Sequence, residues 1–383
     1  MEGFALNVSI VNQKQHEVPM HSTPQPDRRR FLQQTAGTAV AASLAGTIGE
    51  ASAAIQEPAK QDSPSAAPIR ALYASLTKEQ RNTMCFAWDH IGFTKLPLRL
   101  HVTNNWEISK AAISSFTKPQ QRLIDDILAS VLSQGWPDRI KRQACEDTGR
   151  AWGSQKIAIF GSPEKGPCQC VITGFHLTLR ATCERQPTVA FHGALSHGHQ
   201  PSGFNEKVGH PDNIFWNQAV LANKVYQALD EKRRRQSLVV KGMPFYMIDG
   251  RIDRRNILPD TVLPVPLEPD VRFKGAKGTF PGLPIRDMTR EQKNAVDQVL
   301  TGMLEPYRRE YQEQIRHCLR RQGGVEACNL AFYQEHDLGN DGEWDNWRIE
   351  GPSFVWYFRG FPHVHVWIHV AEDPKTPVTS HFG

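Results

Sequence analysis

The sequence lacks the short motifs that mark several large classes of enzyme. It contains no Walker loop, no G-x-G-x-x-G and no G-x-S-x-G, which are the usual marks of nucleotide-dependent enzymes, dinucleotide enzymes and serine hydrolases. It has seven cysteines but no C-x-x-C, so a zinc ribbon is excluded as well. A function must therefore be sought in other side chains.

A strong excess of charge of one sign is also missing. The 383 residues carry a net charge of +5, from 45 Lys and Arg against 40 Asp and Glu. The basic residues are dispersed or lie beside acids, as in Arg308-Arg-Glu310, which is typical of solvated helix faces rather than of a nucleic-acid-binding patch. With 39% hydrophobic and 22% charged residues, the composition indicates a soluble globular protein without a nucleic-acid partner.

The N-terminal segment lacks a long hydrophobic run and indicates export instead. Asp27-Arg-Arg-Arg-Phe-Leu-Gln33 matches the twin-arginine pattern R-R-x-F-L, and Ala51-Ser-Ala53 offers a cleavage site. Between them, residues 35–48 are too few and too weakly apolar for a stable membrane anchor. We therefore predict a twin-arginine signal peptide over residues 1–53, the twin-arginine export machinery as a partner, and a periplasmic or secreted protein.

The segment after the signal peptide predicts a linker and then one domain. Residues 54–69 are rich in Ala, Pro, Ser and Gln, which favours a flexible linker, and residues 70–383 are expected to form a single α+β domain. All seven cysteines lie in the exported part, where an oxidising compartment permits disulfides. Cys168 and Cys170 are two apart on an expected strand, so we expect each to find another partner. Because the twin-arginine route carries folded proteins, often with a cofactor already inserted, it favours a bound metal.

Hydrophobic periodicity predicts an α+β fold. Apolar residues recur at helical spacing in the N-terminal third, with Thr77 and Thr117 placed as N-caps, and a capping box begins at Thr289. Other segments alternate with the period of a strand. The expected helices cover about 76–90, 117–134, 137–150, 214–236 and 289–321, the last bent or broken at Pro306. The expected strands cover 156–161, 168–174, 175–182, 329–336, 347–359 and 361–370. We predict an antiparallel β-sheet with helices on one side and a helical N-terminal third.

The strictest alternation lies near the C-terminus, in Phe361-Pro-His-Val-His-Val-Trp-Ile-His-Val370. A strand points successive side chains to opposite faces, so His363 and His365 share one face while Val364 and Val366 share the other. The two histidines then lie roughly 6.5 Å apart along the strand, at ~3.3 Å per residue. Two neutral imidazoles in this arrangement can ligate one metal ion, although a solvated strand face has the same pattern.

Other histidines can complete such a site. His176 is expected on an alternating strand, on the same polar face as Arg180. If the polar faces of two histidine-bearing strands meet, three imidazoles converge, and zinc, copper and iron all accept imidazole ligands. His192, His197 and His199 lie in a Gly- and His-rich segment, which we expect to be a solvated loop.

A carboxylate can come from Glu335-His-Asp337, which precedes a Gly/Asn turn. We therefore take Glu335 and His336 as candidate catalytic residues.

Five segments together resemble a known family. The family is the domain of unknown function 3500, and the resemblance covers roughly residues 70–370. The landmarks agree in order and spacing: Gly174-Phe-His-Leu-Thr-Leu-Arg180, Phe191-His-Gly193, Gly198-His-Gln-Pro201, Ile349-Glu-Gly-Pro352 and His363-Val-His-Val-Trp367. Related sequences tend to read G-H-H at Gly174-Phe-His176, so the first of those histidines is missing here, and they tend to read H-I-H-S-V-W at the last landmark. The resemblance implies exported bacterial proteins with no established activity, and it implies that His176, His363 and His365 belong to one shared constellation.

These observations favour an exported metal-binding protein in which His176, His363 and His365 hold a divalent ion. A metal-dependent enzyme is preferred, with hydrolysis ahead of other reactions, because a site of imidazoles and a carboxylate needs no further machinery. The substrate, a small molecule or a polymer, is left open by the sequence. Two alternatives remain: a periplasmic binding protein that holds a metal or a sugar without turnover, and an oxidoreductase that uses copper or iron in the same ligands.

Overall fold

The computed structural model describes residues 62–92, 96–184, 188–199, 213–239, 247–248, 251–252, 271–334, 343–360 and 363–380. The predicted signal peptide, residues 1–53, lies outside these ranges. So do the candidate catalytic residues Glu335 and His336.

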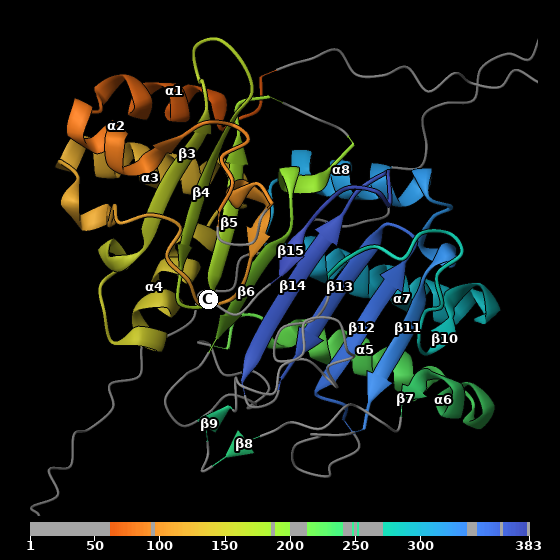
Figure 1. Cartoon of the computed structure of the whole chain (residues 1–383). Helices are drawn as coiled ribbons and strands as arrows, with labels where there is room; N and C mark the ends of the chain where they lie inside the picture. The colour runs from red at the N-terminus through yellow and green to blue at the C-terminus, as the bar shows by residue number, and fades with distance from the viewer. Residues whose placement is uncertain are drawn as a thin grey trace, which may run out of the picture. The chain divides into compact units, whose positions relative to one another are not determined.

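The centre of the described fold is an eleven-stranded sheet, and Figure 1 shows its strands running side by side. Its hydrogen-bonded order is β1-β3-β4-β5-β6-β14-β13-β12-β11-β10, with β7 as a third neighbour of β11, beside β12 and β10. The bounds in this order are β1 Cys85–Phe86, β3 Lys156–Gly161, β4 Cys168–Gly174, β5 Leu177–Thr182, β6 Leu195–His199, β14 Val364–Val370, β13 Phe354–Arg359, β12 Asn346–Gly351, β11 Asn329–Tyr333, β10 Leu283–Pro284 and β7 Leu238–Val239. The pairing of β6 with β14 brings segments from the middle and the end of the chain together.

The prediction of a purely antiparallel sheet was wrong, because the sheet is mixed. β1 pairs with β3 in parallel, and β7 pairs with β11 in parallel. Each of these two-residue strands directly follows a helix, α2 (Lys78–Met84) and α6 (Glu231–Ser237) respectively. Parallel neighbours need a long crossover connection. Here β1 reaches β3 through α3 (Lys118–Val131) and α4 (Trp136–Thr148), and β7 reaches β11 through α7 (Arg290–Leu304) and α8 (Arg309–Arg321).

Most helices cover one face of this sheet. They are α1 (Ala66–Ser75), α3 (Lys118–Val131), α4 (Trp136–Thr148), α5 (Trp216–Ala228), α7 (Arg290–Leu304) and α8 (Arg309–Arg321). Their apolar residues form one large core with alternate strand residues such as Ile159, Leu179, Phe332 and Trp356. The intervening strand residues face two smaller clusters on the other side of the sheet, which irregular segments near Trp106, Val271 and Val378 cover.

Short elements complete the described fold. β2 (His101–Val102) pairs with β15 (Thr379–Ser380), and β8 (Met247–Ile248) pairs with β9 (Arg251–Ile252). The 3-10 helices cover Leu98–Leu100, Ile113–Ser115, Trp152–Ser154, Ala190–His192, Ile285–Asp287 and Val325–Ala327. Across the described residues, no helix is both long enough and apolar enough to cross a membrane.

The predicted helix starts are confirmed. Thr77, Thr117 and Thr289 each cap a helix through a complete capping box, in which the Gln three residues later bonds back to the cap. The boundary between linker and domain needs a correction, because residues 66–69 form the first turn of α1. Ile69 is fully buried there, so apolar packing outweighs the local composition that favoured a linker.

One disulfide closes the hairpin of β4 and β5. It joins Cys168, the first residue of β4, to Cys183, which follows β5. Cys170 stays a buried free thiol. The expectation that each of the two finds another partner is therefore confirmed for Cys168 and wrong for Cys170.

Candidate metal centre

β14 presents its histidines as the alternation predicts. Val364 and Val366 are fully buried in the helix-covered core. His365 points to the other face, and His363 directly precedes the strand. The period-2 pattern holds because the aliphatic side chains enter the large helix-covered core, while Trp367, on the same face as His365, enters a smaller cluster on the other side of the sheet.

His176 reaches the same place from an unexpected position. Gly174 pairs with Leu177, so Phe175 and His176 form a two-residue turn between β4 and β5. The backbone of His176 has φ of 56°, in the left-handed region that few non-glycine residues occupy. We predicted that His176 lies on a strand face with Arg180, and this was wrong, because the strand begins only at Leu177.

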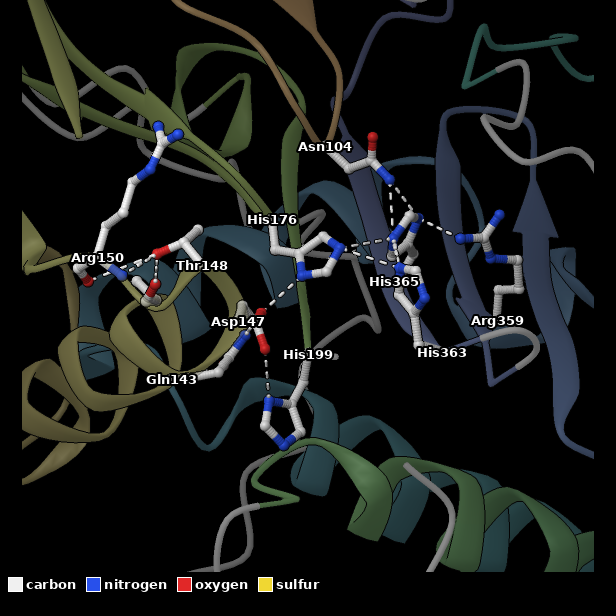
Figure 2. Close-up of polar contacts among 11 residues, drawn as sticks. Asn104, Gln143, Asp147, Thr148, Arg150, His176, His199, Arg359, His363 and His365 are labelled. Carbon is white, nitrogen blue, oxygen red and sulfur yellow. Dashed lines mark hydrogen bonds and ion pairs between the residues drawn. The ribbon is translucent and has the colours of Figure 1, made fainter. Parts of the chain in front are cut away.

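The three predicted ligands nevertheless converge. The Nε2 atom of His176 lies 3.0 Å from Nε2 of His363 and 3.0 Å from Nε2 of His365. The Nε2 atoms of His363 and His365 are 2.7 Å apart. Figure 2 shows the three rings pointing toward one another from the turn and from the start of β14. The sequence-based grouping of these residues is therefore confirmed as a cluster that can hold a metal ion.

The dimensions of this triangle fit a metal ion. Zinc–imidazole bonds are about 2.0–2.1 Å long. With sides of 3.0 Å or less, a point about 2.1 Å from all three nitrogens exists about 1.3 Å above the plane of the triangle. Among the described residues no Cys, Asp or Glu joins the group, so these ligands leave a fourth position of a tetrahedral site open for water or substrate.

Asp147 supports the cluster from the last turn of α4. Its Oδ2 lies 2.6 Å from Nδ1 of His176, and its Oδ1 lies 3.2 Å from Nδ1 of His199. Figure 2 shows the carboxylate between the two rings. A carboxylate accepts a hydrogen bond from Nδ1–H. The ring proton of His176 therefore stays on Nδ1 and the lone pair on Nε2, the nitrogen that faces the other two histidines.

Sequence reasoning missed Asp147. It lies in a polar helical segment with no motif around it, and only the packing of α4 against the sheet brings it beneath the turn.

His365 has two partners of its own. Arg359 Nη2 and Asn104 Nδ2 both contact its Nδ1, and Asn104 Nδ2 lies 2.9 Å from its Nε2. Arg359 can only donate, so its contact needs a lone pair on Nδ1 and places the single proton of a neutral His365 ring on Nε2. Ligation through Nε2 requires the other tautomer, so Arg359 would have to move off Nδ1 when a metal ion binds.

Burial keeps the imidazoles of His176 and His363 neutral. It lowers the pKa of His176, although the hydrogen bond to Asp147 partly opposes this. Burial lowers the pKa of His363 to about 2, with further contributions from the charges of His176 and Arg359. Neutral imidazole is the form that binds metal, so the site is prepared for a cation without prior deprotonation.

The histidines of the predicted solvated loop are buried, so that expectation was wrong. His197 and His199 lie on β6, between β5 and β14, and His192 ends the 3-10 helix before it. The ring of His197 packs 4.2 Å from that of Phe215. The Gly- and His-rich composition suggested a loop, but pairing with two neighbouring strands makes β6 a central strand.

Comparisons with known proteins place the chain in one family. A family model described as "Protein of unknown function (DUF3500)" matches residues 59–374. No curated protein and no solved structure matches the chain.

Proposed function

The chain belongs to the DUF3500 family of proteins of unknown function, and because that description names no activity, we propose a function from the histidine cluster itself. His176, His363 and His365 hold one divalent metal ion, zinc before copper or iron. The protein is an exported metal-dependent enzyme, with hydrolysis as the preferred reaction. The observation that carries the proposal is the meeting of three Nε2 atoms within 3.0 Å of one another.

The surroundings of the cluster support a metal more than a hydrogen-bond network. Asp147 holds the Nδ1 proton of His176, so Nε2 of that ring offers only a lone pair. Nε2 of His176 faces two further Nε2 atoms, and three neutral rings cannot share protons along all three sides of a triangle. A cation at the centre would satisfy all three lone pairs at once.

The residues of the site also support catalysis rather than storage. A zinc ion bound to three imidazoles would supply a Lewis acid and lower the pKa of a water in the open position. Asp147 would keep His176 in the ligating tautomer. Glu335 and His336 remain candidates for proton transfer to or from the substrate.

The disulfide and the N-terminal pattern support export. A disulfide between Cys168 and Cys183 persists in oxidising compartments and is rare in the cytosol. Changing Arg28 and Arg29 together to Lys tests the route: the precursor should stay in the cytoplasm, as cell fractionation would show. Normal export of the double variant would refute the twin-arginine proposal.

The metal is tested by elemental analysis with an optical spectrum of the purified protein. We expect about one metal ion per chain and no visible absorption, as for zinc. A strong visible band with copper or iron would favour the oxidoreductase instead. Stoichiometric zinc that never exchanges its remaining ligand for an added anion such as azide would favour a closed, non-catalytic site.

A further inference from the structure

A second site lies beside the histidine cluster, on the Nδ1 side of His176. It is a cavity of about 340 Å³, within the range of small-molecule sites. Asp147 and Phe175 belong to its wall, and both touch His176: the carboxylate through Nδ1, and the aromatic ring with its centroid 3.9 Å from that of the imidazole. The Nε2 atom of His176 faces the other way, so the cavity is separate from the proposed metal position.

The lining of this cavity suits a hydroxyl-rich ligand. Asn105, Glu107 and Gln155 line it, and their planar end groups can donate to or accept from pairs of neighbouring hydroxyls. Phe175 is only partly buried and offers an aromatic surface on which the C–H face of a sugar ring can pack. This combination of an aromatic wall with a few placed polar groups is typical of small-ligand pockets.

Gln155 gives an independent indication of a ligand. Its side chain is 2% exposed, and its Oε1 has no hydrogen-bond partner within the described structure. The oxygen lies against Gly174, where an added Cβ would come within 1.4 Å of it, so only glycine leaves room for the amide. A buried acceptor without a partner costs about 1–3 kcal/mol. The atom is closed off from solvent as the residues lie, so a ligand reaches it only if the amide turns toward the cavity. A ligand with a donor, such as a hydroxyl group, would then remove this cost, whereas a bare phosphate or carboxylate would not.

Arg150 adds a charge preference at the exposed edge of the cavity. No ion pair of its guanidinium is found in the described part of the chain, whereas the neighbouring Lys156 lies 3.5 Å from Glu107. Figure 2 shows Arg150 on the opposite side of His176 from His363 and His365. A carboxylate on the ligand would pair with this guanidinium.

We propose that this cavity binds a saccharide and that Arg150 gives it a preference for sugars that carry a carboxylate. The site needs both a donor for Gln155 and an acceptor for Arg150, and a uronic acid supplies both. This inference goes beyond the metal site and does not depend on it.

Calorimetric titration of the full chain with glucose, galactose, glucuronate and galacturonate tests the proposal. We expect at least one matched pair to bind, with the uronate tighter than its neutral partner by about tenfold, the effect of one charge-assisted hydrogen bond. Arg150→Gln should abolish that difference and leave the neutral sugar unaffected. Arg142→Gln, on α4 but outside the cavity, is the matched control and should behave as the wild type.

Two further variants test the polar lining. Gln155→Leu should weaken both sugars of the pair by about tenfold. Glu107→Gln changes an exposed residue of the cavity, so it leaves the fold intact and should also weaken binding. If none of the four sugars binds the folded protein, or if both variants bind as the wild type does, the saccharide site is refuted.

Titrating the metal-free and the zinc-loaded protein separately keeps the two proposals apart. Sugar binding without any zinc binding would support this site and refute the metal centre. Zinc binding without sugar binding would do the reverse.

Discussion

Two sets of buried histidines can be compared in this molecule. His176, His363 and His365 point their Nε2 atoms at one another within 3.0 Å. His197 and His369 are as buried as His176 and His365, and more buried than His363, yet each packs against a phenylalanine ring, Phe215 and Phe273 respectively. Burial is therefore not what marks a metal ligand here. The convergence of the ring nitrogens distinguishes the first set.

The comparison is sharpest within one strand. His365 and His369 lie on the same face of β14, four residues apart. Only His365 is close enough to the turn of His176 to join the cluster, while His369 lies under Phe273. The row of imidazoles along the strand was the right place to look, but the third ligand comes from a hairpin turn rather than from the row.

The largest expected effect is the loss of bound metal when a histidine of the first set is replaced. His365→Ala or His363→Ala should weaken zinc binding by at least about 100-fold, more than the loss of a supporting residue, because each removes one of three ligands. Metal per chain after gel filtration measures this, with circular dichroism to check the fold. His369→Ala is the matched control and should keep its zinc. Equal zinc in all three variants would remove the distinction between the sets.

A smaller effect is expected from the residue beneath the cluster. Asp147→Asn should weaken zinc binding by about 10- to 100-fold, because the amide no longer holds the Nδ1 proton of His176 as a carboxylate does. Competition with a zinc-binding dye measures the affinity. Asp138→Asn changes an exposed carboxylate in the first turn of the same helix, and it should leave the affinity unchanged. A loss as large as that of His365→Ala would instead make Asp147 a ligand.

The sequence could predict part of this arrangement. Local patterns were enough to predict the apolar and polar faces of β14 and the Thr caps of the helices. They could not place His176, because its left-handed turn conformation depends on the pairing of Gly174 with Leu177. Asp147 was out of reach for a similar reason: its role arises from the packing of a helix against a turn nearly thirty residues later.

The pairing of the short edge strands and of the central strand β6 could not be predicted from local sequence patterns either. The parallel pairing of β1 and β7 depends on the long connections that lead from β1 to β3 and from β7 to β11, whose course composition does not reveal. β6 looked like a loop because its sequence is rich in glycine and histidine. It becomes a strand because β5 and β14 offer hydrogen bonds on both of its sides.

The buried histidines outside the cluster, such as His197, should make the stability of the protein depend on pH. Burial lowers the pKa of His197 to about 3, against 6.5 for a free side chain. Below pH 6.5 the unfolded state therefore binds the extra proton first, so the free energy of unfolding falls as the pH drops from 6.5 toward 3. Each such histidine contributes a slope of about 1.4 kcal/mol per pH unit.

Urea unfolding at several pH values measures this slope. His197→Leu replaces the ring with an apolar side chain in an apolar setting and should make the dependence below pH 6.5 shallower by about the contribution of one group. His90→Leu changes an exposed histidine and should leave the slope as it is. An unchanged slope in His197→Leu would mean that His197 does not stay neutral in the folded protein.

The most direct test of the central claim is a crystal structure with anomalous diffraction measured at the zinc absorption edge. The account predicts one strong peak about 2.1 Å from the Nε2 atoms of His176, His363 and His365, with a water or another ligand in the remaining position. A zinc-soaked crystal with no peak there, or with its strongest peak at other residues, would contradict it.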